Sequence, residues 1–376
     1  MSTPTYQQCT KTVMDNIADP NITFDKNGVC NYWHEYQKVA KNSLLHDERG
    51  KIKWANSIKE LKKLGKNNKY DCIIGVSGGV DSTYIAYMIK KAKLRPLVVH
   101  FDNGWNSEIA VHNITKIVEY LDADLHTLVI NWEEFRDLQR AYLKAGVVDI
   151  EVLTDHAIIG TLYRLAAKNN IKHVISGTNY ETELTLPKAW IFNKIDPINI
   201  KDIHKKHGTI KLKTYPFFDI LKKKYYLNFK RLTFIMPINW APYNKETVKE
   251  IITKEIGWVD YGGKHHESVF TKFYQNYILP TKFNIDKRKA HLSNLICAGQ
   301  LTKEQAIKEL ELPLYKQEEL IQDKEYVIKK LGFTMAGFEK IMKEQPKSHT
   351  EYKTEGPIEN HYSILKPAKA VYKLFK

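Results

Sequence analysis

The chain has 376 residues, of which 43% are hydrophobic and 27% charged, and its formal net charge is +15 at pH 7. That length holds one large domain or two medium ones with ample core. No apolar run approaches the roughly 18 residues of a membrane helix, and the first residues lack the pattern of a signal peptide. Four scattered cysteines argue against a secreted disulfide framework. We therefore expect a cytoplasmic protein with no membrane partner.

The positive charge is spread along the chain in ones and twos, without a basic tail or an arginine-rich block. Lysine far outnumbers arginine, a bias that a genome of low GC content produces without any selected function. The positive net charge suits an anionic small substrate, whereas nucleic acid is the less favoured partner.

The first 50 residues resemble a zinc ribbon that lacks half of its ligands. Cys9 and Cys30 are present, but Thr12 and Trp33 stand where a second cysteine would complete each pair. Two thiolates cannot close a tetrahedral zinc site. We expect a ribbon-like segment held by packing, with no metal.

The most informative motif is Ser77-Gly78-Gly79-Val80-Asp81-Ser82, between a predicted buried strand (71–76) and a predicted helix (83–89). The glycine pair lets backbone N–H groups converge on one point, to which the helix N-terminus adds partial positive charge. Such a loop is suited to hold a phosphate chain, and Asp81 can orient the loop or a magnesium ion. The arrangement resembles the PP-loop ATP pyrophosphatases, which split ATP between its α and β phosphates. That resemblance implies ATP and Mg²⁺ as cofactors.

Alternating strands and helices follow the loop, as in a parallel α/β sheet. Predicted strands cover 96–101, 124–130 and 172–176, and predicted helices cover 107–121, 132–144 and 155–168. Ligands of such sheets bind beyond the carboxyl ends of the strands. Two strand ends are therefore expected to flank adenine and ribose: Phe101 and Asp102, and Gly177, Thr178 and Asn179. Asp102 has the alternative of an ordinary strand-end cap.

The second half of the chain changes character. Residues 185–214 break into aromatics, lysines and short turns, which we interpret as an insertion or substrate loop. Predicted helices then cover 245–256, 267–279, 286–298, 302–310, 316–331 and 335–343. We expect four parts: a ribbon-like segment (1–50), a PP-loop domain (51–240), a helical region (241–345) and an irregular tail (346–376).

Further motifs narrow the resemblance. They are Phe24-Asp25-x-x-Gly28-Val29-Cys30, Thr154-Asp155-His156-Ala157-Ile158, Ser176-Gly177-Thr178-Asn179, the run from Lys264 to Gln275, and Asp286-Lys287-Arg288-Lys289-Ala290-His291. Together with the loop they resemble the N-acetyl sugar amidotransferases of bacterial surface-polysaccharide (lipopolysaccharide O-antigen) synthesis, from about residue 8 to about residue 345.

This resemblance implies an ATP-dependent enzyme that converts an acetamido group of a sugar into an acetamidino group. The acetamido oxygen takes the adenylyl group, pyrophosphate leaves, and ammonia then displaces AMP. An anionic acceptor, either nucleotide-linked or a free nonulosonic acid, suits the basic chain.

Roles follow from the resemblance. Ser77, Gly78, Gly79, Asp81 and Ser82 would hold the phosphates. Asp81, Lys264 and Glu267 would be catalytic, Lys264 stabilising charge and Glu267 taking a proton from ammonia; the alternative for the last two is a surface ion pair. Asp155 and His156 either begin a helix or align substrate. Lys287, Arg288 and His291 either bind pyrophosphate or a substrate carboxylate, or lie on a solvated helix face.

The sequence offers no candidate glutaminase region and no cysteine nucleophile after Met1. We therefore expect ammonia from a separate glutaminase partner. Two other functions stay open: a tRNA-modifying PP-loop enzyme of the thiolase or lysidine synthetase type, and a non-catalytic nucleotide-binding scaffold.

Overall fold

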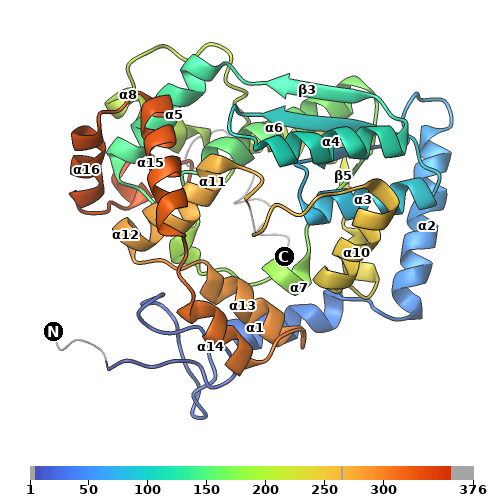
Figure 1. Cartoon of the computed structure of the whole chain (residues 1–376). Coiled ribbons are helices and arrows are strands. Elements are labelled where there is room, and N and C mark those ends of the chain that lie inside the picture. Colours follow the sequence, from blue (N-terminus) through green and yellow to red (C-terminus); the bar gives the residue numbers. More distant parts are fainter. Residues whose placement is uncertain (1–4, 264–265, 357–376) are drawn as a thin grey trace, which may run out of the picture.

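The computed structural model describes residues 5–263 and 266–356. Its centre is a parallel sheet in the order β3-β2-β1-β4-β5, with helices on both faces (Figure 1). The strands are β1 (Cys72–Val76), β2 (Pro96–Asp102), β3 (Leu125–Val129), β4 (His173–Ile175) and β5 (Thr233–Ile235). The predicted parallel α/β sheet is confirmed.

Alternating side chains of the strands build two separate cores. Successive residues of a strand point to opposite faces of the sheet. Ile74 and Val98 therefore pack with α3 and α4 on one face, whereas Ile73 and Leu97 pack with α6 on the other. Because helices cover both faces of the sheet, the sequence of β1 is almost continuously apolar, as is typical of strands in parallel sheets.

Sixteen α-helices surround the sheet in the described part of the chain; one π-helical turn follows α9, and another lies between α11 and α12. The helices before the C-terminal region are α1 (Asn31–Ser43), α2 (Glu48–Gly65), α3 (Val80–Lys91), α4 (Glu108–Leu121), α5 (Trp132–Ala145), α6 (Val152–Lys168), α7 (Tyr180–Glu183), α8 (Pro197–His207) and α9 (Ile220–Lys224). The later helices are α10 (Lys245–Ile256), α11 (Val269–Phe273), α12 (Leu279–Phe283), α13 (Arg288–Cys297), α14 (Lys303–Glu311), α15 (Gln317–Leu331) and α16 (Met335–Lys343). Among the described residues, no helix is long and apolar enough to cross a membrane.

The C-terminal helices form a lobe beside the sheet rather than a detached domain. α11 packs on α15, and α13 packs on α7 and α14 (Figure 1). The chain at the start of this lobe is paired with the loop after β2: the Ser107 N–H donates to the Glu267 carbonyl (2.9 Å), and the Val269 N–H donates to the Trp105 carbonyl (2.9 Å). These bonds fix the lobe over the carboxyl ends of the strands.

Helix starts were the best predicted elements, because caps are visible in sequence. The Asn244 side chain caps α10, and Thr302 forms a capping box with Gln305 at the start of α14. The predicted helix 267–279 is divided by a π-helical turn at Tyr274–Ile278, and it continues through α12.

Several elements were not predicted. Residues 185–214 are not only turns: they contain α8, which Asp196 caps and Pro197 begins. The edge strand β5 was missed, as were α1 and α2. Helix α2 crosses residue 50, where the sequence pattern had suggested a boundary.

The N-terminal segment brings its two cysteines together. The Cys30 N–H donates to the Cys9 Sγ (3.2 Å), and the Thr12 hydroxyl lies 3.7 Å from the Cys30 Sγ. Thr12 thus lies beside the two cysteines. Its relation to a zinc ribbon stays a prediction.

Candidate active site

The phosphate loop borders a cavity and is held by hydrogen bonds of its own: the Gly79 N–H donates to the Ser77 Oγ (3.2 Å), and the Ser77 N–H donates to the Ser82 Oγ (3.4 Å). Gly78 has a φ of +79°, and a Cβ there would lie 2.7 Å from the Ala110 carbonyl oxygen, so only glycine fits. The Gly78 carbonyl accepts from the Trp258 indole (2.9 Å) and the Asn113 amide (3.3 Å). This contact turns the carbonyl away from the cavity. Gly79 caps α3, so the first N–H groups of that helix point to the same place.

Asp81 lies in the first turn of α3 and is fixed from two sides. Its Oδ1 accepts from the Tyr243 hydroxyl (2.7 Å) and the Asn179 amide (3.3 Å). Burial, followed by the nearby Asp81 charge, raises the pKa of Tyr243 well above its usual value, so the phenol stays a donor. Asp81 is therefore held in one orientation beside the loop.

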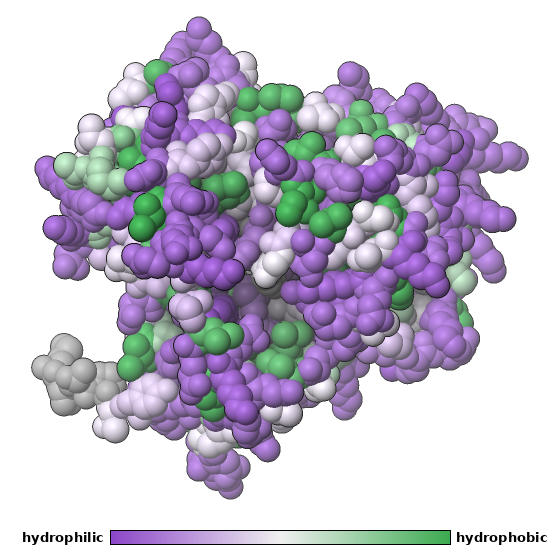
Figure 2. All heavy atoms as spheres, viewed as in Figure 1, coloured by the Kyte–Doolittle hydropathy of each residue, from purple (hydrophilic) through white to green (hydrophobic). Residues whose placement is uncertain are grey.

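Two connected chambers lie beyond the carboxyl ends of β1, β2 and β4, and the surface is hollowed between the sheet and the C-terminal lobe (Figure 2). The first chamber, of about 620 Å³, borders the ends of these strands, the start of α6 and residues 185–194. The second, of about 670 Å³, borders the phosphate loop, α10 and α13. Residues shared by both chambers mark their junction: Ser77, Ser176, Gly177, Glu183, Glu267, Gln275, Lys287 and His291.

Three of the five predicted nucleotide contacts outside the loop line the chambers, and two do not. Phe101 lines the first chamber, Gly177 lines both, and Thr178 lines the second. Asp102 does not line either chamber. Its carboxylate accepts from the Gly104 N–H (2.8 Å) and the Asn106 amide (3.2 Å), so the strand-end cap is the correct alternative.

Asn179 is also corrected. It is fully buried, its amide donates to Asp81, and its Oδ1 accepts from the Glu181 N–H. It therefore positions Asp81 and caps α7 instead of touching a nucleotide.

Glu267 lies beside the phosphate loop. Its Oε1 is 3.7 Å from the position that a Cβ on Gly79 would take, and the carboxyl group lines both chambers. Burial and then the charge of Glu267 raise the pKa of the neighbouring Tyr261. Lys264, the other predicted catalytic residue of this motif, lies outside the described residues.

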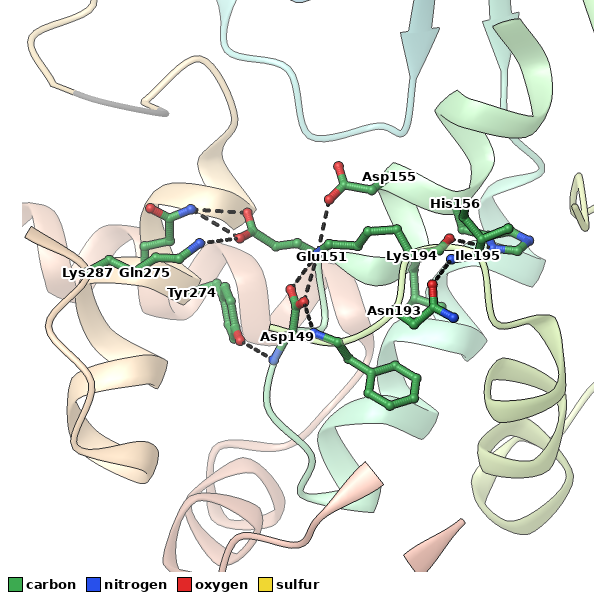
Figure 3. Close-up of polar contacts among 12 residues, drawn as sticks. Asp149, Glu151, Asp155, His156, Asn193, Lys194, Ile195, Tyr274, Gln275 and Lys287 are labelled. Carbon is green, nitrogen blue, oxygen red and sulfur yellow. Dashed lines mark hydrogen bonds and ion pairs between the residues drawn. The ribbon is translucent and has the colours of Figure 1, made fainter. Parts of the chain in front are cut away.

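Opposite the loop, carboxylates and lysines form one wall of the first chamber (Figure 3). The Lys194 ammonium lies 2.8 Å from Asp149 and 3.0 Å from Asp155, and the Lys287 ammonium lies 3.1 Å from Glu151. Burial opposes charge on Lys194, but the carboxylates of Asp155 and Asp149 raise its pKa. Lys194 therefore stays charged.

His156 and Arg288 were predicted to bind substrate, and their donors and acceptors are already used by the protein. His156 is fully buried; its Nε2 accepts from the Phe218 N–H (2.9 Å), and its Nδ1 contacts the Lys194 carbonyl (2.9 Å). It lies inside α6 and not at its cap, because the helix begins at Val152. Burial, the largest cause, lowers the pKa of His156 to about 4.

All five N–H donors of Arg288 are occupied. The guanidinium binds Asp286 and the carbonyls of Glu309, Leu310 and Leu312 at the end of α14. Arg288 borders the second chamber, but it caps a helix instead of offering donors to a ligand. Its neighbours Lys287 and His291 line both chambers.

Several lining residues were missed from the sequence: Glu151, Glu183, Lys194, Tyr243 and Gln275. Glu183 carried a weak signal, because it is an acidic residue in the short helix that follows the end of β4. Lys194 lies in a segment without periodicity, and nothing in the sequence singles it out.

The donor set fits a magnesium ion bound together with phosphates. Asp81, Glu183 and Glu267 line the second chamber, yet no cluster of three such side chains in the described residues is close enough to hold an ion alone. Mg²⁺ is usually bound by one or two carboxylates together with waters and substrate phosphates.

The parallel sheet and the loop between β1 and α3 have the arrangement of the PP-loop fold. Residues 53–195 match the family model of NAD synthase, and residues 267–366 match the C-terminal domain of WbpG-like LPS biosynthesis proteins. The chain thus joins a segment similar to NAD synthase, which carries the PP-loop fold, to a segment similar to the C-terminal domain of WbpG-like LPS biosynthesis proteins.

Solved structures with a similar fold are distant. An NH3-dependent NAD synthetase from Campylobacter jejuni is 12% identical, with a TM-score of 0.33, over 83% of this chain and 98% of that chain. A predicted subunit of tRNA methyltransferase from Methanocaldococcus jannaschii is 11% identical, with a TM-score of 0.28, over 49% of this chain and 75% of that chain. Similarity this low carries no argument about activity. No curated protein matches the chain.

Proposed function

We propose that the protein is an ATP-dependent amidotransferase that converts an acetamido group of an anionic N-acetyl sugar into an acetamidino group for surface-polysaccharide synthesis. AMP and pyrophosphate are the other products. The observation that carries the proposal is the fixed phosphate loop at the junction of two chambers, which together are large enough for a nucleotide and a second substrate.

The order of the chambers supports an attack on the α phosphate. Donors of the loop and of the α3 N-terminus suit the β and γ phosphates. The apolar residues over the strand ends, among them Phe101 and Ile158, suit the adenine ring. The α phosphate then falls near the junction, where Ser77, Gly177 and Glu267 meet.

The chemistry explains why ATP is needed. An amide oxygen is a poor leaving group. When that oxygen attacks the α phosphorus, the bond to the β-phosphate oxygen breaks, pyrophosphate leaves, and the amide loses its N–H proton to give an O-adenylyl imidate. Ammonia adds to the imidate carbon, the C–O bond breaks, AMP leaves, and one ammonia proton is lost. The product is an amidine.

The residues at the junction have matching roles in this proposal. Glu267 accepts the proton that ammonia loses, and the loop N–H groups stabilise the charge on the departing pyrophosphate. Mg²⁺, bound by the phosphates and by Asp81 or Glu183, would offset phosphate charge. The packing of the C-terminal lobe over the strand ends limits access of water to the imidate.

Ammonia is expected from a separate glutaminase, with exogenous ammonium as its substitute in vitro. Full activity of the isolated chain with glutamine would contradict this part of the proposal.

The test is pyrophosphate release from ATP, Mg²⁺ and ammonium across a panel of acidic and neutral acetamido sugars. Mass spectrometry of the sugar should show the loss of about one mass unit that replacing O by NH produces. Release with bulk tRNA, and with none of the sugars, would instead support an RNA-modifying enzyme. Binding of ATP without turnover of any acceptor would support a scaffold.

A further inference from the structure

The two walls of the first chamber differ sharply in polarity. One wall, formed by the end of β2 and by α6, is apolar, with Phe101, Ile158 and Leu162. The opposite wall, which we call the polar wall, carries Asp149, Glu151, Asp155, Lys194, Gln275 and Lys287 (Figure 3). A purine base suits the first wall, so the polar wall is left for the other substrate.

The polar wall is anchored by a buried ion pair. Asp149 is 2% exposed and has a φ of +62°; its backbone N–H donates to the Tyr274 hydroxyl (2.7 Å), and its carboxylate accepts from the Phe192 N–H (2.7 Å). Lys194 contacts both oxygens of Asp149 at 2.8 Å and Asp155 at 3.0 Å. An ammonium group has three donors, so these contacts use all of them. Lys194 is therefore a positioning residue.

Two groups of the wall keep capacity for a ligand. The Asp155 side chain is 45% exposed, and Lys194 contacts one of its oxygens. The Lys287 ammonium donates to the Glu151 Oε2 at 3.1 Å, a contact that needs one of its three donors. The Gln275 amide also lies 3.3 and 3.1 Å from the two Glu151 oxygens. The Gln275 amide therefore still donates to Glu151 when Lys287 turns toward a ligand.

We propose that the polar wall is the acceptor subsite, in which Lys287 binds the carboxylate of an acidic acetamido sugar and Asp155 accepts hydrogen bonds from its hydroxyl groups. This inference rests on the proposed function. Lys287 borders both chambers, so a sugar held by it can direct its acetamido oxygen toward the junction, where the α phosphate is placed. The buried Asp149–Lys194 pair fixes the position of Asp155.

The experiment compares N-acetylneuraminic acid with its methyl ester, in which a methyl group replaces the carboxylate charge. Their binding is titrated by saturation-transfer NMR in the presence of Mg²⁺ and α,β-methylene-ATP. The full chain should bind the acid at least tenfold more tightly than the ester. Lys287→Met should reduce this preference to within twofold, and Asp155→Asn should weaken both probes by a similar factor.

Matched controls are Lys308→Met and Asp122→Asn, both exposed and outside the chambers. Neither should change binding of either probe. Equal binding of acid and ester by the unaltered chain, or a full preference in Lys287→Met, would overturn the subsite. Pyrophosphate release is measured separately: a chain that binds the acid through Lys287 but turns over no acetamido sugar would refute the proposed function and leave the subsite standing.

Discussion

The two sides of the cavity are built from different parts of the polypeptide. On the sheet side, the cavity is bordered by the backbone of the phosphate loop and the start of α3, held in place by contacts such as that between Trp258 and the Gly78 carbonyl. On the opposite side, the polar wall presents polar and charged side chains from the start of α6 and the residues before it, from the π-helical turn at Tyr274–Ile278, and from the segments before α8 and α13. Backbone groups suit a ligand that is the same in every member of a family, whereas side chains can change with the acceptor. We therefore expect the phosphate-loop side to determine catalysis and the polar wall to determine acceptor specificity.

The largest effect should come from the backbone side. Gly78→Ala places a methyl group 2.7 Å from the Ala110 carbonyl oxygen at a φ of +79°, so the loop must move. Displacing fixed donors from a developing charge costs about 10²–10³ in rate, and we expect a loss of about that size in pyrophosphate release.

Gly299→Ala is the matched control. Gly299 also has a positive φ (+71°), but nothing lies within 4 Å of an added Cβ. It should lower the free energy of unfolding by about 1 kcal/mol and leave turnover unchanged. Equal losses of turnover in both variants would show that strain, and not the loop donors, matters.

Buried His156, which lies behind the polar wall, should make the stability of the protein depend on pH. His156 contacts the Lys194 carbonyl, and burial lowers its pKa to about 4, below the roughly 6.5 of an unfolded chain. Between these values the unfolded chain binds more protons, so stability falls as the pH falls. Below about pH 4 both states are protonated, and this contribution is lost entirely. The full effect is about 3 kcal/mol.

Urea unfolding at several pH values measures this slope. His156→Gln should flatten it, and replacing the exposed His112 by glutamine should not. An unchanged slope in His156→Gln would place the acid sensitivity elsewhere.

A smaller effect should follow from loosening Asp81. Tyr243→Phe removes the hydroxyl that donates to Asp81 at 2.7 Å and keeps the ring. We expect about a tenfold loss of turnover, because the carboxylate keeps the longer contact to the Asn179 amide (3.3 Å) but loses this shorter one. Tyr87→Phe, which alters a neighbouring ring stack, should have no effect. Comparable losses in the two variants would point to packing in place of the hydrogen bond.

The smallest expected effect is that of Arg288→Lys, which should differ from the effect of changing the adjacent Lys287. Arg288→Lys cannot satisfy three carbonyls and a carboxylate, so the free energy of unfolding should fall by about 1 kcal/mol. The KM for the acceptor should stay within twofold, in contrast to Lys287→Met. A tenfold rise in that KM for Arg288→Lys would restore Arg288 as a ligand of the acceptor.

The two sides of the cavity also differ in how well the sequence predicts them. The phosphate loop is contiguous, and its glycines and flanking strand are visible as a pattern. The polar wall is assembled from residues between 149 and 287, and its pairing depends on contacts such as Glu151–Lys287, which join the residues just before α6 and α13. No local pattern contains that information.

Residue chemistry alone cannot distinguish a ligand contact from a structural one. Arg288, His156, Asn179 and Asp102 all carry suitable groups, and in each case the backbone or a neighbouring side chain takes them. The missed α8 is a different case, since the Asp196–Pro197 start was visible but the aromatic and lysine-rich composition obscured it.

The most direct test of the central claim follows the acetamido oxygen. An acceptor sugar labelled with ¹⁸O in that carbonyl group is incubated with ATP, Mg²⁺ and ammonium, and AMP is analysed by mass spectrometry. Adenylation of the amide oxygen predicts AMP that is heavier by about two mass units and an amidine without label. Unlabelled AMP, or label retained in the sugar product, would contradict the account.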